Sequence, residues 1–344
     1  MVDPRRLAWL VLGFLVPAGT LAQSVDSDQL TPATTQQGSS SAQSRTEGAL
    51  FLLLPSGAQG VAVGRAMTAR SSSESAFWNP AGLAGLESSR VLLFRGDHVA
   101  GEATGISALL AGAGRGSLAL SYQLLDVGTQ DLRDPDGQVV GSISVRSHLG
   151  LVSGGISIGS RIRTGVNLKS LQYRVTCRGQ CPDGSVSATS YATDLGIQAR
   201  PLRNQPLELG LMVAHLGSDF QVEGSQQADP LPTRIRLGAA YDILDAFAEE
   251  DLGMSIMFEL EDRLRDPGQL SYLVGAEFFA EAGAIDQVSI RGGYIFGKRN
   301  QTDGAGLGFG VHYDRVEFGI ARSLARSSLS SGDEPVHVTL GFTF

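Results

Sequence analysis

The amino-acid sequence predicts an all-β protein: a transmembrane antiparallel β-barrel of about fourteen strands with an N-terminal hatch segment. Three observations predict this fold class. The chain of 344 residues contains 44 glycines but only 18% charged residues, and this composition disfavours helix interiors and suits a large sheet with many turns. From about residue 89 onward, apolar residues alternate with small or polar ones. A targeting-type segment opens the chain and an aromatic residue, Phe344, ends it.

The first 22 residues have the organisation of a signal peptide. Arg5 and Arg6 supply positive charge, residues 7–16 form an apolar core, and Thr20-Leu21-Ala22 fits a cleavage site. This core is too short to span a bilayer as a helix, and no later stretch reaches the roughly 18 consecutive apolar residues that a spanning helix needs. We therefore expect a cleaved signal peptide, and the sequence excludes a helical membrane protein.

Two further segments precede the alternating region. Residues 23–48 are rich in Ser, Gln and Thr and predict a flexible leader. Residues 49–88 are rich in Gly and Ala, and their apolar residues have no regular spacing, which predicts short helices and loops instead of a strand. The most distinctive run in this hatch segment is Phe77-Trp78-Asn79-Pro80-Ala81. The predicted barrel then occupies residues 89–344.

The last strand shows the alternation most clearly. Val336, Val338, Leu340, Phe342 and Phe344 share one face, and His337, Thr339, Gly341 and Thr343 share the other. Fourteen segments repeat this pattern: 89–98, 102–111, 115–125, 145–157, 161–175, 187–199, 206–216, 233–244, 251–262, 269–280, 285–297, 303–313, 315–323 and 335–344. An apolar face opposite a Gly- and Ser-rich face is typical of strands that meet lipid outside and a polar lumen inside.

The gaps between these segments alternate in length. Those after the odd-numbered segments are mostly long, such as 126–144 and 217–232, whereas those after the even-numbered segments are mostly short, such as 112–114. Long outer loops and short periplasmic turns are the outer-membrane pattern. The sequence therefore predicts an outer-membrane location with both termini in the periplasm and with lipid around the barrel. The strand ending in Phe344 resembles the signal that barrel-assembly machinery reads.

Several cationic residues fall on the predicted inward faces. They are Arg161, Arg163, Lys169, Arg234, Arg236 and Arg291. One interpretation is that they line a polar lumen. The alternative is that they pair with inward acids such as Glu208 and Glu259 and simply fill the barrel.

Other residues that could carry chemistry are few. Cys177 and Cys181 lie in the gap at 176–186, and an oxidising envelope favours a disulfide between them. The five histidines have no metal-ligand spacing, and Gly155-Ile-Ser-Ile-Gly159 lies in a strand pattern that runs into a tight turn, unlike a hydrolase elbow. The net charge of −8 argues against a nucleic-acid partner. We therefore expect no catalytic, cofactor-binding or metal site.

A family resemblance adds to this interpretation. Residues 51–66, Phe-Leu-Leu-Leu-Pro-Ser-Gly-Ala-Gln-Gly-Val-Ala-Val-Gly-Arg-Ala, and residues 75–84, Ser-Ala-Phe-Trp-Asn-Pro-Ala-Gly-Leu-Ala, resemble the opening of the PorV/PorQ family. Further matches follow in the family's order at 165–169, 193–196, 229–241 and 291–294. That family is similar to FadL-type barrels of fourteen strands, in which an Asn-Pro-Ala element belongs to an internal plug, as Asn79-Pro80-Ala81 would here.

The resemblance implies two roles. A PorV-like protein binds exported cargo proteins for type IX secretion and passes them to a surface sortase. A FadL-like protein transports hydrophobic small molecules across the outer membrane, and it would hold them in an apolar pocket near Phe77 and Trp78. The sequence predicts the first role and keeps the second as its alternative.

Overall fold

The computed structural model describes residues 47–98, 100–112, 116–181, 184–244, 252–282, 285–297, 303–324 and 335–344. The predicted signal peptide and nearly all of the predicted leader lie outside these residues. No helix in the described part of the chain is long and apolar enough to cross a membrane.

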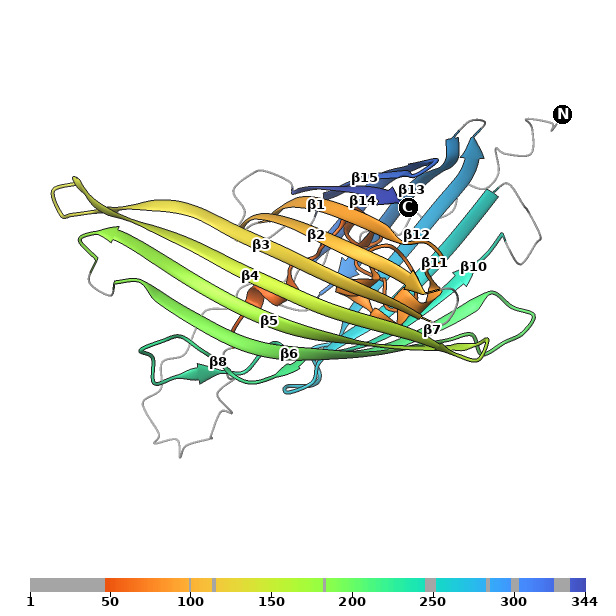
Figure 1. Cartoon of the computed structure of the whole chain (residues 1–344), viewed down its shortest axis with the longest axis horizontal. Coiled ribbons are helices and arrows are strands. Elements are labelled where there is room, and N and C mark those ends of the chain that lie inside the picture. Colours follow the sequence, from red (N-terminus) through yellow and green to blue (C-terminus); the bar gives the residue numbers. More distant parts are fainter. Residues whose placement is uncertain are drawn as a thin grey trace, which may run out of the picture. The chain divides into compact units, whose positions relative to one another are not determined.

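Fourteen strands form one closed antiparallel barrel, which confirms the predicted fold class (Figure 1). The first, β1, pairs with the last, β16, so the barrel wall has no free end. The strands are β1 (Arg90–His98), β2 (Gly101–Gly112), β3 (Gly116–Arg133), β4 (Val139–Ile158), β5 (Ile162–Gly179), β6 (Val186–Ala199), β7 (Leu207–Gly217), β10 (Arg234–Asp242), β11 (Leu252–Arg263), β12 (Ser271–Ala282), β13 (Ile285–Phe296), β14 (Gly304–Tyr313), β15 (Val316–Ser323) and β16 (Val336–Thr343). Two short strands, β8 (Phe220–Gln221) and β9 (Ala228–Asp229), pair with each other between β7 and β10.

The prediction of a long gap at 126–144 is wrong. Strand β3 continues to Arg133 and β4 already starts at Val139, and the two pair over this whole stretch. Strand β5 continues to Gly179 beside β4. Both faces of these extensions carry many polar residues, so the chain shows no clear apolar alternation there, and backbone hydrogen bonds hold the strands together. We call residues 127–145, 175–181 and 184–186 the projection, because they extend beyond the other strands (Figure 1).

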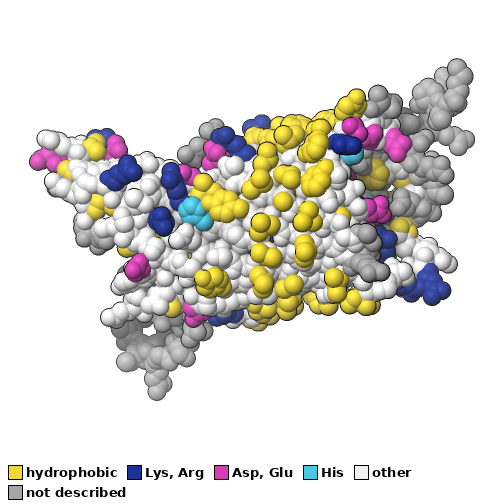
Figure 2. Space-filling view, viewed as in Figure 1, with side chains coloured by type: hydrophobic (Ala, Val, Ile, Leu, Met, Phe, Trp, Pro, Cys, Tyr) yellow, Lys and Arg dark blue, Asp and Glu magenta, His cyan; other side chains and the backbone are white. Residues whose placement is uncertain are grey.

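The alternation gives the barrel an apolar exterior. On β3 and β4, for example, Leu118, Leu120, Val152 and Ile156 are more than half exposed, and apolar side chains form a broad band across the strands (Figure 2). The inward positions between them are small or polar, as at Ser121, which is buried. A water-soluble barrel would place these two sets the other way round, so the exterior suits a lipid environment.

The two ends of the barrel differ. We call one the short-turn end, where β4 and β5 are joined by residues 159–161, and the other the long-loop end, where β7 and β10 are joined by residues 218–233. Phe344 lies at the short-turn end and its backbone N–H donates to the Ser89 carbonyl. Glu47, the first described residue, lies at the long-loop end beside Arg234. Because residues 1–46 lie outside the described part of the chain, the periplasmic location of both termini stays a prediction.

Candidate functional site

Residues 47–89, which we call the inner segment, lie inside the barrel and cross it from one wall to the other. The segment contains η2 (Leu50–Leu53), α1 (Ala58–Ala62), α2 (Ser75–Trp78) and η3 (Pro80–Gly85). Helix α1 contacts the wall formed by β13 to β16, and η3 contacts the wall formed by β3 to β6. These irregular elements span residues 50–85, which is nearly all of the segment 49–88 that the sequence predicts as a hatch.

Glycines on the barrel wall let the inner segment approach closely. A Cβ atom at any of them would overlap the backbone of the inner segment, because that backbone lies where a side chain would otherwise stand. These glycines are distributed over both walls: Gly155 and Gly165 face Pro80, Gly210 faces Thr68, Gly275 and Gly293 face Val63, and Gly306 faces Val61. These glycines therefore provide a surface on which the inner segment docks.

Asn79 holds the predicted hatch motif in shape. Its side-chain oxygen accepts a hydrogen bond from the Ala81 N–H at 3.1 Å and so caps η3, and its amide donates to the Thr68 carbonyl at 2.7 Å. Asn79 is fully buried against Gly196. The Asn-Pro-Ala element thus joins two turns of the inner segment and seats them on β6.

Glu74 performs a similar role on the opposite wall. Its carboxylate accepts hydrogen bonds from the backbone N–H groups of Gln59 and Gly60 at 3.0 and 2.9 Å, and the Thr339 hydroxyl on β16 donates to it at 3.2 Å. Burial raises the pKa of Glu74 to about 7, and these backbone hydrogen bonds act in the opposite direction. Glu74 therefore ties α1 to α2 and to the barrel, although no sequence motif marked it.

A pocket lies between the inner segment and the wall at the predicted position beside Phe77 and Trp78. Its lining combines apolar side chains from the inner segment and the wall with polar ones: Phe51, Leu52, Leu54, Phe77, Trp78, Leu149, Leu151 and Met212 with Ser56, Arg65, Gln123, Lys169, His215 and Arg236. The free volume is about 30 Å³, which is room for about one water molecule, whereas a cavity that binds benzene measures about 150 Å³. The pocket is therefore closed to hydrocarbons in this conformation.

Phe77 lines this pocket and connects the apolar side chains around it. Its partly buried ring packs against three separate apolar clusters, which otherwise share no member, and it meets Phe94 of β1 edge to face at 5.0 Å. On the long-loop side, Phe220 and Leu231 from the segment between β7 and β10 join one of these clusters. A molecule entering the pocket from that side would first have to displace these side chains.

The polar wall of the pocket is a buried network around Asp194. The Lys169 ammonium lies 2.6 Å from one carboxylate oxygen and the Asn167 amide donates to the same oxygen at 2.7 Å. The other oxygen accepts from the His215 backbone N–H at 2.8 Å. His215 lies in a β-bulge, where β7 places two residues opposite Asp194 and His215 adopts a φ of 61°. These side chains are almost completely buried.

Arg163, Arg234, Arg236 and Arg291 also face inward, next to carboxylates, whereas Arg161 lies in the turn that joins β4 and β5. Arg236 pairs with Glu261 at 2.7 Å and Glu259 at 4.0 Å, and its guanidinium lies 5.9 Å from the centre of the Trp78 ring. The remaining ion pairs are Arg163 with Glu208 at 3.5 Å, Arg234 with Glu47 at 2.7 Å, and Arg291 with Glu277 at 2.6 Å. The sequence named Glu208 and Glu259 as partners but missed the others. Glu261 and Glu277 occupy inward positions of their strands, so alternation alone was a sufficient signal for them.

A second cavity, of about 430 Å³, opens at the short-turn end. It is lined by the end of η3 and by Arg161, Arg163, Arg200 and Glu208. Arg163 donates to the Ser71 hydroxyl at 2.8 Å, and Arg200 donates to Glu208 at 2.6 Å. This cavity is larger than the pocket beside Phe77 and more polar.

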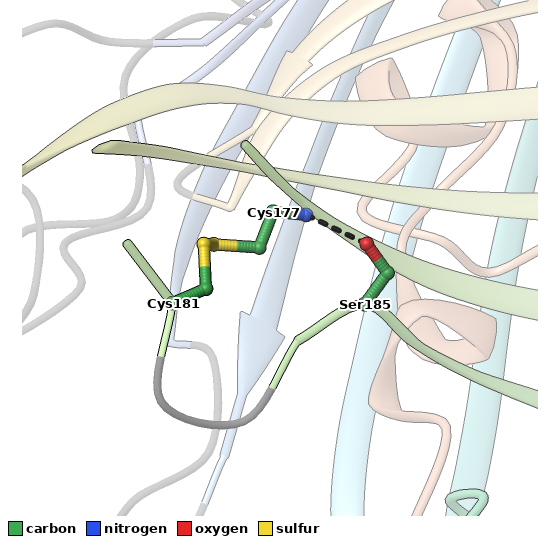
Figure 3. The surroundings of a disulfide bond; sticks show 3 residues. All are labelled: Cys177, Cys181 and Ser185. Carbon is green, nitrogen blue, oxygen red and sulfur yellow. Dashed lines mark hydrogen bonds between the residues drawn. A yellow bond between two sulfur atoms is a disulfide. The ribbon is translucent and has the colours of Figure 1, made fainter. Parts of the chain in front are cut away.

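The remaining predicted sites lie away from the lumen. Cys177 and Cys181 form a disulfide at the end of β5, and the Cys177 N–H donates to the Ser185 hydroxyl (Figure 3). The described residues contain no group of three or more His, Cys, Asp or Glu side chains that would hold a metal ion. The Phe344 side chain is 62% exposed on the barrel exterior. Its role as an assembly signal stays a prediction.

Sequence comparisons identify no relative. No protein-family model matches this chain, and no curated protein matches it.

Structure comparisons do find similar folds. The CymD monoaromatic hydrocarbon channel has a TM-score of 0.58 and 11% identity, over 87% of this chain and 98% of its own. A FadL homologue from Pseudomonas aeruginosa has a TM-score of 0.54 and 10% identity, over 85% and 98%. The toluene transporter TbuX of Ralstonia pickettii has a TM-score of 0.53 and 10% identity, over 83% and 97%. At such low identity these likenesses concern the fold alone, and the fold that the chain shares with these proteins is the closed antiparallel barrel.

Proposed function

We propose that this protein lets hydrophobic small molecules cross the outer membrane, with the inner segment as the gate of the route. The observation that carries the proposal is the pocket beside Phe77 and Trp78, which combines apolar and polar side chains and lies inside a closed barrel whose exterior suits lipid. The fold is also that of proteins described as a monoaromatic hydrocarbon channel and a toluene transporter.

The interior charges support an uncharged cargo. Arg234, Arg236 and Arg291 each lie within ion-pair distance of a carboxylate, so the lumen offers a passing ion few uncompensated groups. Separating such a buried pair to bind an ion is costly. An apolar molecule needs no counter-charge and would displace apolar side chains of the pocket, such as Phe51 and Phe77.

The secretion role stays a prediction, because no contact or likeness described above points to it. Recovery of exported proteins with the barrel from native membranes would favour it. Hydrophobic transport is favoured instead by the pocket and by the fold.

Replacing Phe77 by alanine is the direct test of the gate. Removing the partly buried ring leaves space beside the pocket, and we expect this to lower the barrier to passage by about 1.4 kcal/mol or more. We expect toluene entry into proteoliposomes containing the purified protein to become about tenfold faster or more, since about 1.4 kcal/mol is a factor of ten.

Phe309→Ala is the matched control. Phe309 lies on the exterior of β14 and is 41% exposed, so the same substitution there leaves the pocket unchanged. Toluene entry should then remain at the wild-type rate. If Phe77→Ala folds as a barrel and toluene entry does not change, the route does not pass Phe77 and the proposed gate is wrong.

A further inference from the structure

Two arginines stand side by side on the outside of the barrel. Arg146 of β4 and Arg174 of β5 are direct cross-strand partners. Both point outward, because their neighbours Ser147 and Tyr173 face inward, where Ser147 is buried and Tyr173 packs on an apolar cluster. Directly opposite residues of an antiparallel pair have Cα atoms about 4.5–5.5 Å apart, and like charges there are destabilising. This arrangement therefore lacks a structural advantage of its own.

Nearby carboxylates compensate only one of the two charges. Asp126 on β3 accepts a hydrogen bond from Arg146 at 2.9 Å. Among the described residues, no carboxylate lies within 4.0 Å of the Arg174 guanidinium. Glu223 is nearby, since it accepts a hydrogen bond from Ser187, the cross-strand partner of Arg174. The pair nevertheless leaves an exposed cationic group unneutralised.

His148 extends this patch towards the apolar band. It lies two residues along β4 from Arg146, and its ring is hydrogen-bonded to the Tyr122 hydroxyl of β3 at 2.6 Å. We call Tyr122, Arg146, His148 and Arg174 the exterior basic patch. It combines two guanidinium groups with a hydrogen-bonded tyrosine–histidine pair, which keeps one further donor for an anion.

The position of the exterior basic patch along the barrel axis matches the surface of the bilayer. Twelve residues separate Ile158, at the short-turn end of β4, from Arg146. At about 3.3 Å per residue and a tilt of about 40°, this is about 30 Å along the barrel axis, just beyond an apolar band about 25 Å tall. Lys, Arg and His side chains lie where the apolar band gives way to the projection (Figure 2). The exposed Leu120, Val152 and Leu168 lie closer to the middle of the band.

We propose that the exterior basic patch binds the phosphate-bearing headgroup of a lipid in the surrounding outer leaflet, whose acyl chains lie against the adjacent apolar band. Arg146 and Arg174 hold the phosphate with charge-assisted hydrogen bonds. Tyr122 and His148 contact the headgroup on the side that faces the apolar band. A bound phosphate removes the repulsion between the two arginines, which explains why the barrel places them opposite each other. The site lies outside the lumen and is independent of the transport route.

Native mass spectrometry of the purified full-length barrel in detergent tests this proposal. The probes are phosphatidic acid and phosphatidylcholine with identical acyl chains. The variant is Arg146→Gln with Arg174→Gln, and the control is Arg133→Gln with Arg178→Gln, which removes the same charge from exposed positions farther along the projection. Circular dichroism confirms that each variant retains the barrel.

Wild-type protein should bind phosphatidic acid more tightly than phosphatidylcholine. Each arginine near a membrane surface contributes a factor of about five in affinity, so the Arg146/Arg174 variant should bind phosphatidic acid about 25-fold more weakly, while the control changes less than twofold. Equal weakening in the control variant would show a general charge effect and overturn the proposal. Displacement of phosphatidic acid by millimolar inorganic phosphate would also overturn it, because the site would then recognise a free anion.

Discussion

Replacing Asp194 by alanine is expected to destabilise the barrel by about 3–5 kcal/mol, the usual cost of leaving a buried charge without its partner. Lys169 is 5% exposed and Asp194 is fully buried, so water cannot replace the missing carboxylate. The substitution also removes the acceptor for the His215 backbone N–H, which holds the bulge of β7. The measurement is the free energy of unfolding in urea of the protein in micelles.

Two further variants separate this cause from others. Asp194→Ala combined with Lys169→Met removes both charges, and we expect it to recover most of the lost stability, because apolar replacements of buried ion pairs are often neutral. Glu102→Ala removes an exposed partner of Arg95 on the barrel exterior and should cost less than about 1 kcal/mol. If the double variant is no more stable than Asp194→Ala, the buried charge of Lys169 is not the source of the instability.

Replacing Gly165 by alanine is expected to displace the inner segment from the wall. The new methyl group would overlap the backbone of Pro80 and Ala81. A backbone, unlike a side chain, cannot change its rotamer to relieve the overlap. Overpacking of this kind costs about 1–3 kcal/mol. Because the affected contact seats η3 on β5, we expect trypsin to cleave at Arg65 and Arg70 at least tenfold faster and the lumen to conduct ions.

Gly150 offers a closely matched comparison on the neighbouring strand. A Cβ atom at Gly150 would meet nothing within 4 Å, so Gly150→Ala should show wild-type cleavage and no ion current. Equal behaviour of Gly165→Ala and Gly150→Ala would mean that close docking on glycine does not hold the inner segment in place.

The sequence predicted the strands well because each strand separates two environments. Alternation is strong where one face meets an apolar surrounding and the other meets the inner segment, as in β16, where Leu340 and Phe342 face outward and Thr339 faces inward. In the projection both faces meet water, no alternation is required, and the prediction of a loop at 126–144 failed. Apolar alternation marks strands that separate an apolar from a polar environment, and it is absent from strands that have water on both faces.

The site was harder to predict because its contacts join residues far apart in the chain. The sequence marked Asn79 and Pro80 but did not show that they rest on Gly196 and Gly165, more than 80 residues away. Glu74 stood in no motif, and its partner Thr339 lies 265 positions further on. A partner at such a distance leaves no local periodicity, so only the folded chain reveals it.

The path of the inner segment also determines how the protein responds to mechanical force. The segment is anchored at the long-loop end by the Glu47–Arg234 ion pair and continues directly into β1 at the short-turn end. It is therefore held at both ends. A force applied to the chain before Glu47 would act on the Glu47–Arg234 ion pair first. Under such a force the contacts of the inner segment with the barrel would break one after another, from Glu47 towards Pro80. The segment would not leave the barrel as one unit.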